Sequence, residues 1–322
     1  MAKKPTENTE AYRLYLLGLS FWNQRTGDGI KKAIDYFEQA LVKDPNYALA
    51  QVGLADCYLL LPQYAGIPGK EALPKARAAA LTALKLDDTL GESHAALASV
   101  REMNGDWQGA EAEYRRAIEL TPNYATAHHW YSLLLRELGR FEEASREIQR
   151  AQELDPLSPV INVNVGEVLY YQGRYDQAIA AYRTVLELNP NFPVTHLDLG
   201  DAYLMKQMYS EAITEFQTVR ASVGNTPYGL GYLGHAYGLS SRGNEARKVL
   251  DDLTGFLNQG YEVQYDIALV YHGLGNRERA LDWLEKEAQT RGMLGLKVDP
   301  LLQNLRSEPR FIALLKKMGL EK

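Results

Sequence analysis

The sequence contains one cysteine among its 322 residues, Cys57. A single cysteine excludes a disulfide within one chain, and it excludes zinc or iron–sulfur sites built from several thiolates. The chain also lacks any run of 18 apolar residues, the length that a helix needs to cross a bilayer. The first eight residues lack the apolar segment of a secretory signal peptide. The sequence therefore favours a cytoplasmic location, or an extracytoplasmic one if the chain is a piece of a membrane-anchored protein.

An excess of positive charge is missing as well. Lys and Arg number 35 against 41 Asp and Glu, so the net charge is −6 at pH 7. Nucleic acids and anionic membranes attract basic surfaces, so this balance argues against both as partners. The apolar share of 46% and the charged share of 24% are typical of a chain that folds in water.

No catalytic or cofactor-binding motif is present. His128 and His129 are adjacent, so on a helix they point about 100° apart and cannot hold one ion together. The stretch from Gly229 to Gly234 matches G-x-G-x-x-G, but a dinucleotide loop needs a preceding strand, and this stretch falls in a helical pattern. We expect Gly229 and Gly231 only to weaken that helix, by about 1 kcal/mol each. The sequence therefore predicts no enzyme, no cofactor and no metal site.

What the sequence has instead is a pattern that recurs every 34 residues. The set Ala110, Tyr114, Ala117 and Pro122 returns as Ala144, Ile148, Ala151 and Pro156, and then as Ala178, Tyr182, Val185 and Pro190. A glycine turn precedes each set, at Gly105, Gly139 and Gly173. This period, with small residues at fixed offsets and a closing proline, is the signature of tetratricopeptide repeats. The chain resembles tetratricopeptide-repeat (TPR) proteins over nearly its whole length.

The resemblance implies an all-α fold, a right-handed α-solenoid of about eight helix-turn-helix repeats with a C-terminal helical cap. We expect a flexible tail over 1–8, the repeat array over 9–294 and the cap over 295–322. The expected repeats lie near 9–47, 48–90, 91–124, 125–158, 159–192, 193–226, 227–260 and 261–294. Residues 61–69 carry two prolines and two glycines, which predicts an irregular turn and not helix interior. This insertion is either a partner contact or a tolerated surface loop.

In TPR proteins the concave groove is lined by residues at fixed positions of the first helix in each repeat. Counting those positions here gives a face that is apolar, aromatic and acidic, with one Arg and no Lys. The candidate peptide-binding residues on it are Tyr15, Trp22, His129, Val163, Glu167, Tyr170, Leu197, Asp201, His235 and Tyr265. The Lys, Arg and Asn set that holds acidic chaperone tails in part of the family is absent. The expected partner is therefore a protein or peptide with apolar anchors and some positive charge.

The function that this resemblance implies is a non-enzymatic scaffold for protein–protein interaction. The opening at 9–22 and the ending at 305–320 resemble the C-terminal TPR module of bacterial multi-domain signalling proteins. In those proteins the module follows a kinase, a cyclase or a winged-helix regulator, and none of these domains is present here. The chain would then be a docking or sensing module. A self-assembling homo-oligomer or an intramolecular regulatory module is the alternative, followed by a small-molecule binder.

Overall fold

The structure is a computed structural model that describes residues 6–290 and 294–320. Within those ranges every regular element is a helix, which confirms the predicted all-α class. None of the helices there is both long enough and apolar enough to cross a membrane. Residues 1–5 of the expected tail lie outside the described part. The end of that tail is tied down, because the Thr6 hydroxyl donates to the Asp44 carboxylate and the Asn8 amide donates to the Lys43 carbonyl.

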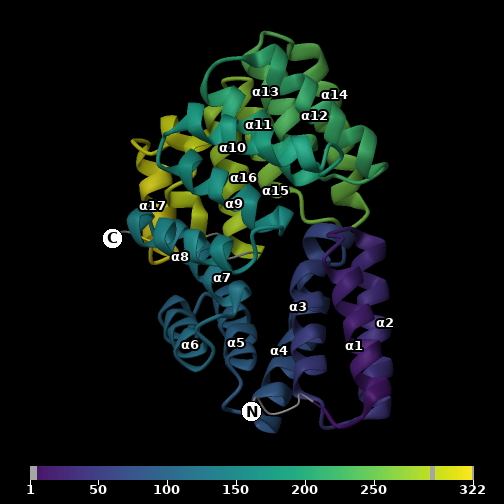
Figure 1. Ribbon diagram of the computed structural model, residues 1–322. Coiled ribbons are helices and arrows are strands. Elements are labelled where there is room, and N and C mark those ends of the chain that lie inside the picture. The colour runs from purple at the N-terminus through teal and green to yellow at the C-terminus, as the bar shows by residue number, and fades with distance from the viewer. Residues whose placement is uncertain (1–5, 291–293, 321–322) are drawn as a thin grey trace. The chain divides into compact units, whose positions relative to one another are not determined.

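The helices follow one another in pairs within two compact units, Met1–Tyr131 and Ser132–Lys322. Unit 1 contains α1 (Thr9–Trp22), α2 (Gly27–Lys43), α3 (Ala48–Ala65), α4 (Gly69–Leu86), α5 (Gly91–Met103), α6 (Trp107–Leu120) and the first half of α7 (Ala125–Glu137). Unit 2 continues with α8 (Phe141–Leu154), α9 (Pro159–Tyr171), α10 (Tyr175–Leu188), α11 (Pro193–Met205), α12 (Tyr209–Val223), α13 (Leu230–Leu239), α14 (Gly243–Asn258), α15 (Gln264–Gly273) and α16 (Arg277–Thr290). Figure 1 shows the first pairs, with α1 beside α2 and α3 beside α4.

Glycine on the first helix of a pair and an aromatic ring on the second explain why the pairs stack closely. A Cβ at Gly18 of α1 would lie 2.4 Å from the Phe37 ring, and a Cβ at Gly53 of α3 would lie 2.6 Å from the same ring. Phe37 is fully buried between these helices. Gly166 stands in the same relation to Tyr182 in unit 2. The same contact between a glycine and an aromatic ring therefore recurs along the chain and sets the close distance between the helices.

From the pair α5 and α6 onward, the turn inside each pair places one residue in the left-handed region of backbone space. These residues recur at 34-residue intervals as Gly105, Gly139, Gly173, Gln207, Ser241 and Gly275, with φ between 58° and 77°. Glycine adopts this conformation without steric cost, whereas Gln207 and Ser241 adopt it against the preference of a side chain. The 34-residue spacing of these turns is therefore kept where Gln207 and Ser241 stand in place of glycine.

The prediction of an irregular turn over residues 61–69 is wrong for most of that stretch. Helix α3 continues to Ala65 with Pro62 inside it, and α4 begins at Gly69, so only residues 66–68 connect the two. Leu61 is buried, so packing outweighs the hydrogen bond that the proline nitrogen cannot make. Gly66, with φ of 65°, ends α3 by donating its N–H to the Leu61 carbonyl.

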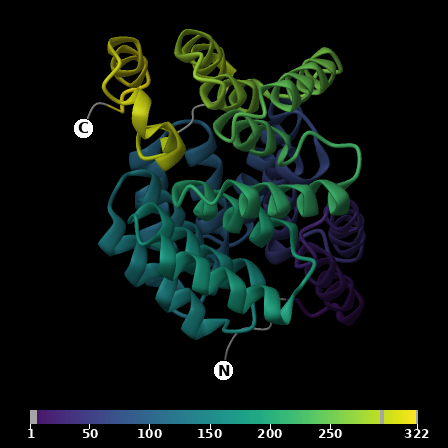
Figure 2. The same cartoon turned by 90° about the horizontal axis from the view of Figure 1, so that it is seen from above.

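After α16 the chain forms two short 3₁₀ helices, η1 (Leu294–Lys297) and η2 (Pro300–Leu305), and then α17 (Pro309–Lys317). Arg310 of α17 contacts three acidic side chains of α16, which are Glu278, Asp282 and Glu285, at 2.8 to 3.0 Å. The apolar residues of this part that enter the same core as α9 to α16 are Leu296, Leu301, Leu302, Leu305, Phe311 and Leu314. Figure 2 shows this part in yellow near the C-terminus.

Candidate functional site

The ten candidate groove residues all lie on the first helix of a pair. Tyr15, Trp22 and His129 belong to unit 1, and the other seven belong to unit 2. The buried members are His129, Val163, Tyr170, Leu197 and His235, and the partly exposed ones are Tyr15, Trp22, Glu167, Asp201 and Tyr265. Their role in binding a peptide stays a prediction. The partly exposed members are the ones that a partner reaches without displacing the core.

An ion pair lies at the centre of the unit 2 candidates. The buried guanidinium of Arg136 in α7 lies 2.5 Å from the carboxylate of Glu167 in α9 and 3.2 Å from that of Glu137. The same guanidinium lies over the ring of Tyr171, with 4.6 Å from its carbon to the ring centroid. Arg136 is the one arginine at the counted groove positions, and its charge is neutralised within the fold by these carboxylates.

Two further carboxyl groups lie on α11, where the charge of Arg136 partly offsets the burial of Asp198, and no cation offsets that of Asp201. Burial, together with the neighbouring carboxylates, raises the pKa of both well above the usual range. The Oδ1 atom of Asp201 is enclosed and has no hydrogen-bond partner. Unit 2 therefore holds more carboxyl groups on this face than Arg136 can pair.

The first helices of the pairs in unit 2, which are α9, α11, α13 and α15, are called its inner helices below. A segment of the chain itself, residues 295–306 (the C-terminal segment), lies against inner helices of this unit. Asp299 accepts a hydrogen bond from the Tyr265 hydroxyl of α15. Its other carboxylate oxygen accepts from the Leu301 N–H at 2.9 Å, and burial raises the pKa of its carboxyl. Val298 lies beside Gly139 in the turn after α7, and η2 contacts α11. Sequence reasoning missed this placement, because no local pattern encodes a contact between residues so far apart in the chain.

The candidate His235 makes contacts between helices of the fold. Its ring stacks on that of His272, with 5.2 Å between centroids and 7° between planes. Its Nδ1–H donates to the Leu269 carbonyl at 2.7 Å, and burial lowers its pKa to about 4, so the ring is neutral at pH 7. Among the described residues, no group of three or more His, Cys, Asp and Glu side chains could hold a metal ion.

In unit 1 two buried charged residues lie near the candidates Tyr15 and Trp22. Asp56 of α3 is 6% exposed, and burial raises the pKa of its carboxyl to about 8. Arg25, in the turn between α1 and α2, is also 6% exposed, and its guanidinium lies 3.7 Å above the Trp22 ring. Asp56 occupies a groove position that could be counted from the sequence, whereas no sequence signal marks Arg25.

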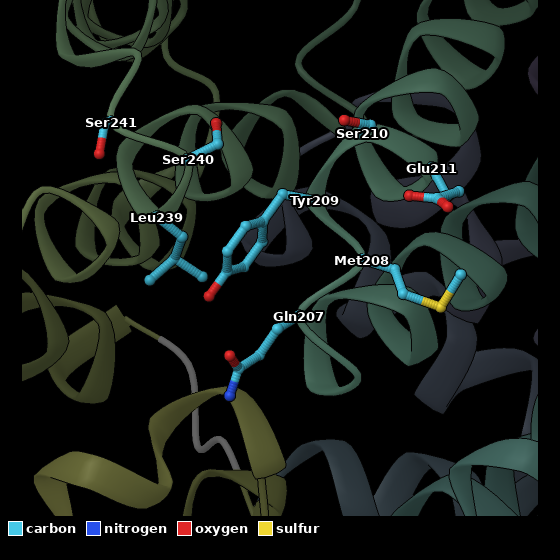
Figure 3. A pocket seen from close by; sticks show the side chains of 8 residues that line it. All are labelled: Gln207, Met208, Tyr209, Ser210, Glu211, Leu239, Ser240 and Ser241. Atoms are coloured by element: carbon cyan, nitrogen blue, oxygen red, sulfur yellow. The ribbon is translucent and has the colours of Figure 1, made fainter.

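A shallow depression of about 500 Å³ lies at the turn between α11 and α12 in unit 2. Figure 3 shows the side chains that line it, which are Gln207, Met208, Tyr209, Ser210, Glu211, Leu239, Ser240 and Ser241. It is open, and it lacks the apolar enclosure with convergent polar groups that small-molecule sites have. The depression therefore gives the small-molecule alternative no support.

Several family models and known structures match this arrangement. Models described as tetratricopeptide repeat match residues 15–89 and 103–161, and one described as TPR repeat matches residues 166–207. Together these ranges cover more than half of the chain. Among proteins with curated descriptions, none matches the sequence.

The structural matches share the fold at low sequence identity. A tetratricopeptide repeat protein from Parabacteroides merdae is 16% identical, with a TM-score of 0.55 over 82% of this chain and 99% of its own. The human IFIT1 dimer with PPP-AAAA is 18% identical, with a TM-score of 0.58 over 82% of this chain and 69% of its own. PilW, a type IV pilus biogenesis factor, is 19% identical, with a TM-score of 0.54 over 69% and 97%.

At such identities a structural likeness shows the fold alone. The repeated glycine and aromatic contacts, the 34-residue register of the turns and the matched family models agree on the same architecture. The chain belongs to the tetratricopeptide-repeat family, whose members are generally scaffolds for protein–protein interaction.

Proposed function

We propose that this scaffold binds a protein or peptide segment on the inner helices of unit 2, through apolar anchors and at least one positive charge. The observation that carries the proposal is the buried carboxyl group of Asp201, whose Oδ1 has no hydrogen-bond partner and which no cation of the fold offsets, with the Asp198 carboxyl close to it. The resemblance of the chain's opening and ending to bacterial signalling proteins supports a docking or sensing role in such a system.

The chemistry of the face favours a cation. A buried carboxyl group without a partner costs free energy, and it reduces that cost by holding a proton. A Lys or Arg side chain from a partner would remove the cost by pairing with Asp198 or Asp201. The Tyr170 and Leu197 side chains beside them are part of the core and supply an apolar floor.

A double variant, Asp198→Asn with Asp201→Asn, is expected to bind cationic peptides at least tenfold more weakly than the wild-type chain, because charged hydrogen bonds contribute about 1.5–3 kcal/mol each. Dodecapeptides selected from a random displayed library against the wild-type chain serve as the probe. Their affinities for both chains are measured by fluorescence anisotropy at two salt concentrations.

The amide variant keeps the shape of both side chains and removes only their ability to ionise, so we expect it to stay folded and to lose the attraction to a cation. Asp251→Asn, an exposed aspartate of α14, is the matched control and should leave the affinities unchanged. Selected peptides without Lys or Arg, or peptides that bind the double variant as tightly as the wild type, would refute the proposal.

An intramolecular regulatory module is the second candidate, and the position of the C-terminal segment favours it. The segment already lies on the inner helices of unit 2, where Asp299 is held by the Tyr265 hydroxyl. A partner that needs this face would have to displace the segment. The chain's affinity for such a partner would then be reduced by the free energy that holds the segment in place.

Tyr265→Phe is expected to loosen the C-terminal segment, because it removes the hydroxyl that donates to Asp299 and leaves the ring in place. Amide hydrogen exchange over residues 296–305 should become about tenfold faster, as the loss of a hydrogen bond to a carboxylate implies. The selected peptides should bind this variant more tightly.

Tyr261→Phe is the control, because the Tyr261 ring packs on Phe256 with an edge contact that the substitution keeps. Unchanged exchange over 296–305 in Tyr265→Phe would show that the hydroxyl does not hold the segment. Faster exchange with unchanged peptide affinity would show that the segment does not regulate access.

A further inference from the structure

Three polar groups without partners lie together in unit 1. The indole Nε1 of Trp22, the Nε of Arg25 and the Oδ1 of Asp56 are each enclosed by protein, and none has a hydrogen-bond partner. The Arg25 guanidinium lies 3.7 Å above the Trp22 ring, and its charge acts on the Asp56 carboxyl without reaching the distance of an ion pair. Buried polar groups are nearly always paired, so this concentration of unpaired ones requires an explanation.

Two of the three groups can only donate a hydrogen bond. An indole N–H and a guanidinium have no acceptor atom, and both are left without one here. A guanidinium that stacks on an aromatic ring uses its face, so its edge remains free for an acceptor in the plane. Burial raises the pKa of Asp56 to about 8, so at pH 7 its carboxyl is mostly neutral and also able to donate.

The charge of these groups decides which acceptor fits. Asp56 relieves its own burial by holding a proton, but Arg25 stays charged because a guanidinium keeps its proton in proteins. The group therefore has a net positive charge at neutral pH and a surplus of donors. A cationic ligand would be repelled by Arg25, whereas a planar anion can accept from the guanidinium edge.

We propose that Trp22, Arg25 and Asp56 form a binding subsite for a carboxylate group. One carboxylate oxygen accepts from the Arg25 guanidinium, and the other accepts from the Trp22 indole N–H or the Asp56 hydroxyl. The Tyr15 ring, between Phe37 and Tyr47 at 5.7 and 5.2 Å, adds apolar surface on the same helix as Trp22. This subsite lies in unit 1 and does not depend on the function proposed for unit 2.

Three small probes with one shared ring separate the possible ligand classes. Phenylacetate carries the carboxylate, phenylacetamide replaces it by a neutral amide, and phenethylammonium replaces it by a cation. In the full ¹⁵N-labelled chain, phenylacetate should shift the Nε–H resonances of Arg25 and Trp22 at millimolar concentration. Stronger shifts with the amide or the cation would overturn the proposal.

Variants locate the binding within the subsite. Arg25→Gln should weaken phenylacetate binding at least tenfold, and Arg77→Gln, an exposed arginine of α4, should leave it unchanged. Asp56→Leu should weaken phenylacetate binding as well. Asp56→Asn should bind phenylacetate more tightly than Asp56→Leu does, because the amide donates a hydrogen bond. Equal affinity of the wild-type chain and Arg25→Gln would overturn the proposal.

A polypeptide or a small organic acid could supply the carboxylate, and one more comparison distinguishes them. The blocked peptide Val-Asp-Pro-Leu-Leu-Gln-Asn-Leu, the sequence of residues 298–305, offers an aspartate among apolar residues. If a polypeptide is the source, this peptide should bind more tightly than phenylacetate, and both Arg25→Gln and an Asp-to-Asn peptide should weaken it tenfold. If a small acid is the source, phenylacetate should bind more tightly. No shift of the Arg25 and Trp22 resonances with either probe would refute the subsite, whatever the unit 2 variants show.

Discussion

Gly238→Ala is expected to destabilise unit 2 by about 3 kcal/mol, the upper part of the range for overpacking a tight contact. A Cβ at this position of α13 would lie 2.4 Å from the carbonyl carbon of Gly273 and 2.7 Å from the nitrogen of Leu274. Both are backbone atoms at the C-terminal end of the neighbouring helix α15, so no side-chain rotation relieves the overlap. The helices would have to separate, and the stacked rings of His235 and His272 would separate with them.

Gly255→Ala in α14 provides the matched control, because a Cβ there meets no atom within 4 Å. The same change of residue should stabilise that helix by up to about 1 kcal/mol. Urea unfolding and amide exchange of α13 and α15 measure both variants, since stacked repeats can open locally without unfolding the whole chain. Equal stability of Gly238→Ala and the wild-type chain would show that the two helices are not held in close contact.

The sequence predicted the helix pairs because their determinants are local. Phe37 follows Gly18 by 19 residues and precedes Gly53 by 16, and one ring contacts both glycines. A ring follows a contacting glycine by 16 residues at Gly166 and Tyr182 and again at Gly200 and Phe216, so a count along the chain recovers much of the packing. The expected cost of Gly229 to the first helix of the seventh repeat is wrong, because α13 begins one residue later and Gly229 lies outside it.

The sequence could not predict contacts that only the folded chain creates. A Cβ at Gly231 would lie 2.6 Å from the Asp266 backbone, so this glycine permits a close packing that its effect on helix propensity does not reveal. The hydrogen bond between Tyr265 and Asp299 joins residues 34 apart, one in a repeat and one beyond the array. Arg25 lies in a turn, where the repeat pattern assigns no role. Each of these features depends on tertiary contacts that produce no repeating pattern in the sequence.

Asp56→Asn is expected to stabilise unit 1 by about 4 kcal/mol at pH 7. Burial raises the pKa of Asp56 from 3.8 to about 8, so the folded chain holds a proton that the unfolded chain has released. The neutral carboxyl contributes its full stability below pH 4, and that contribution is lost as the pH rises toward 8. At pH 7 the span from the unfolded pKa of 3.8 up to the pH corresponds to about 4 kcal/mol, since each unit amounts to about 1.36 kcal/mol.

The amide cannot ionise, so the gain of Asp56→Asn over the wild-type chain should shrink to nearly zero at pH 4. Urea unfolding followed by exchange of the α3 amides, at intervals from pH 4 to pH 8, tests this slope. Asp35→Asn, on the exposed face of α2, should show no such gain. A gain that is equal at pH 4 and pH 7 would mean that Asp56 is ionised in the folded chain and paired with Arg25. The unpaired guanidinium on which the carboxylate subsite depends would then be lost, so this stability measurement also tests the proposed ligand.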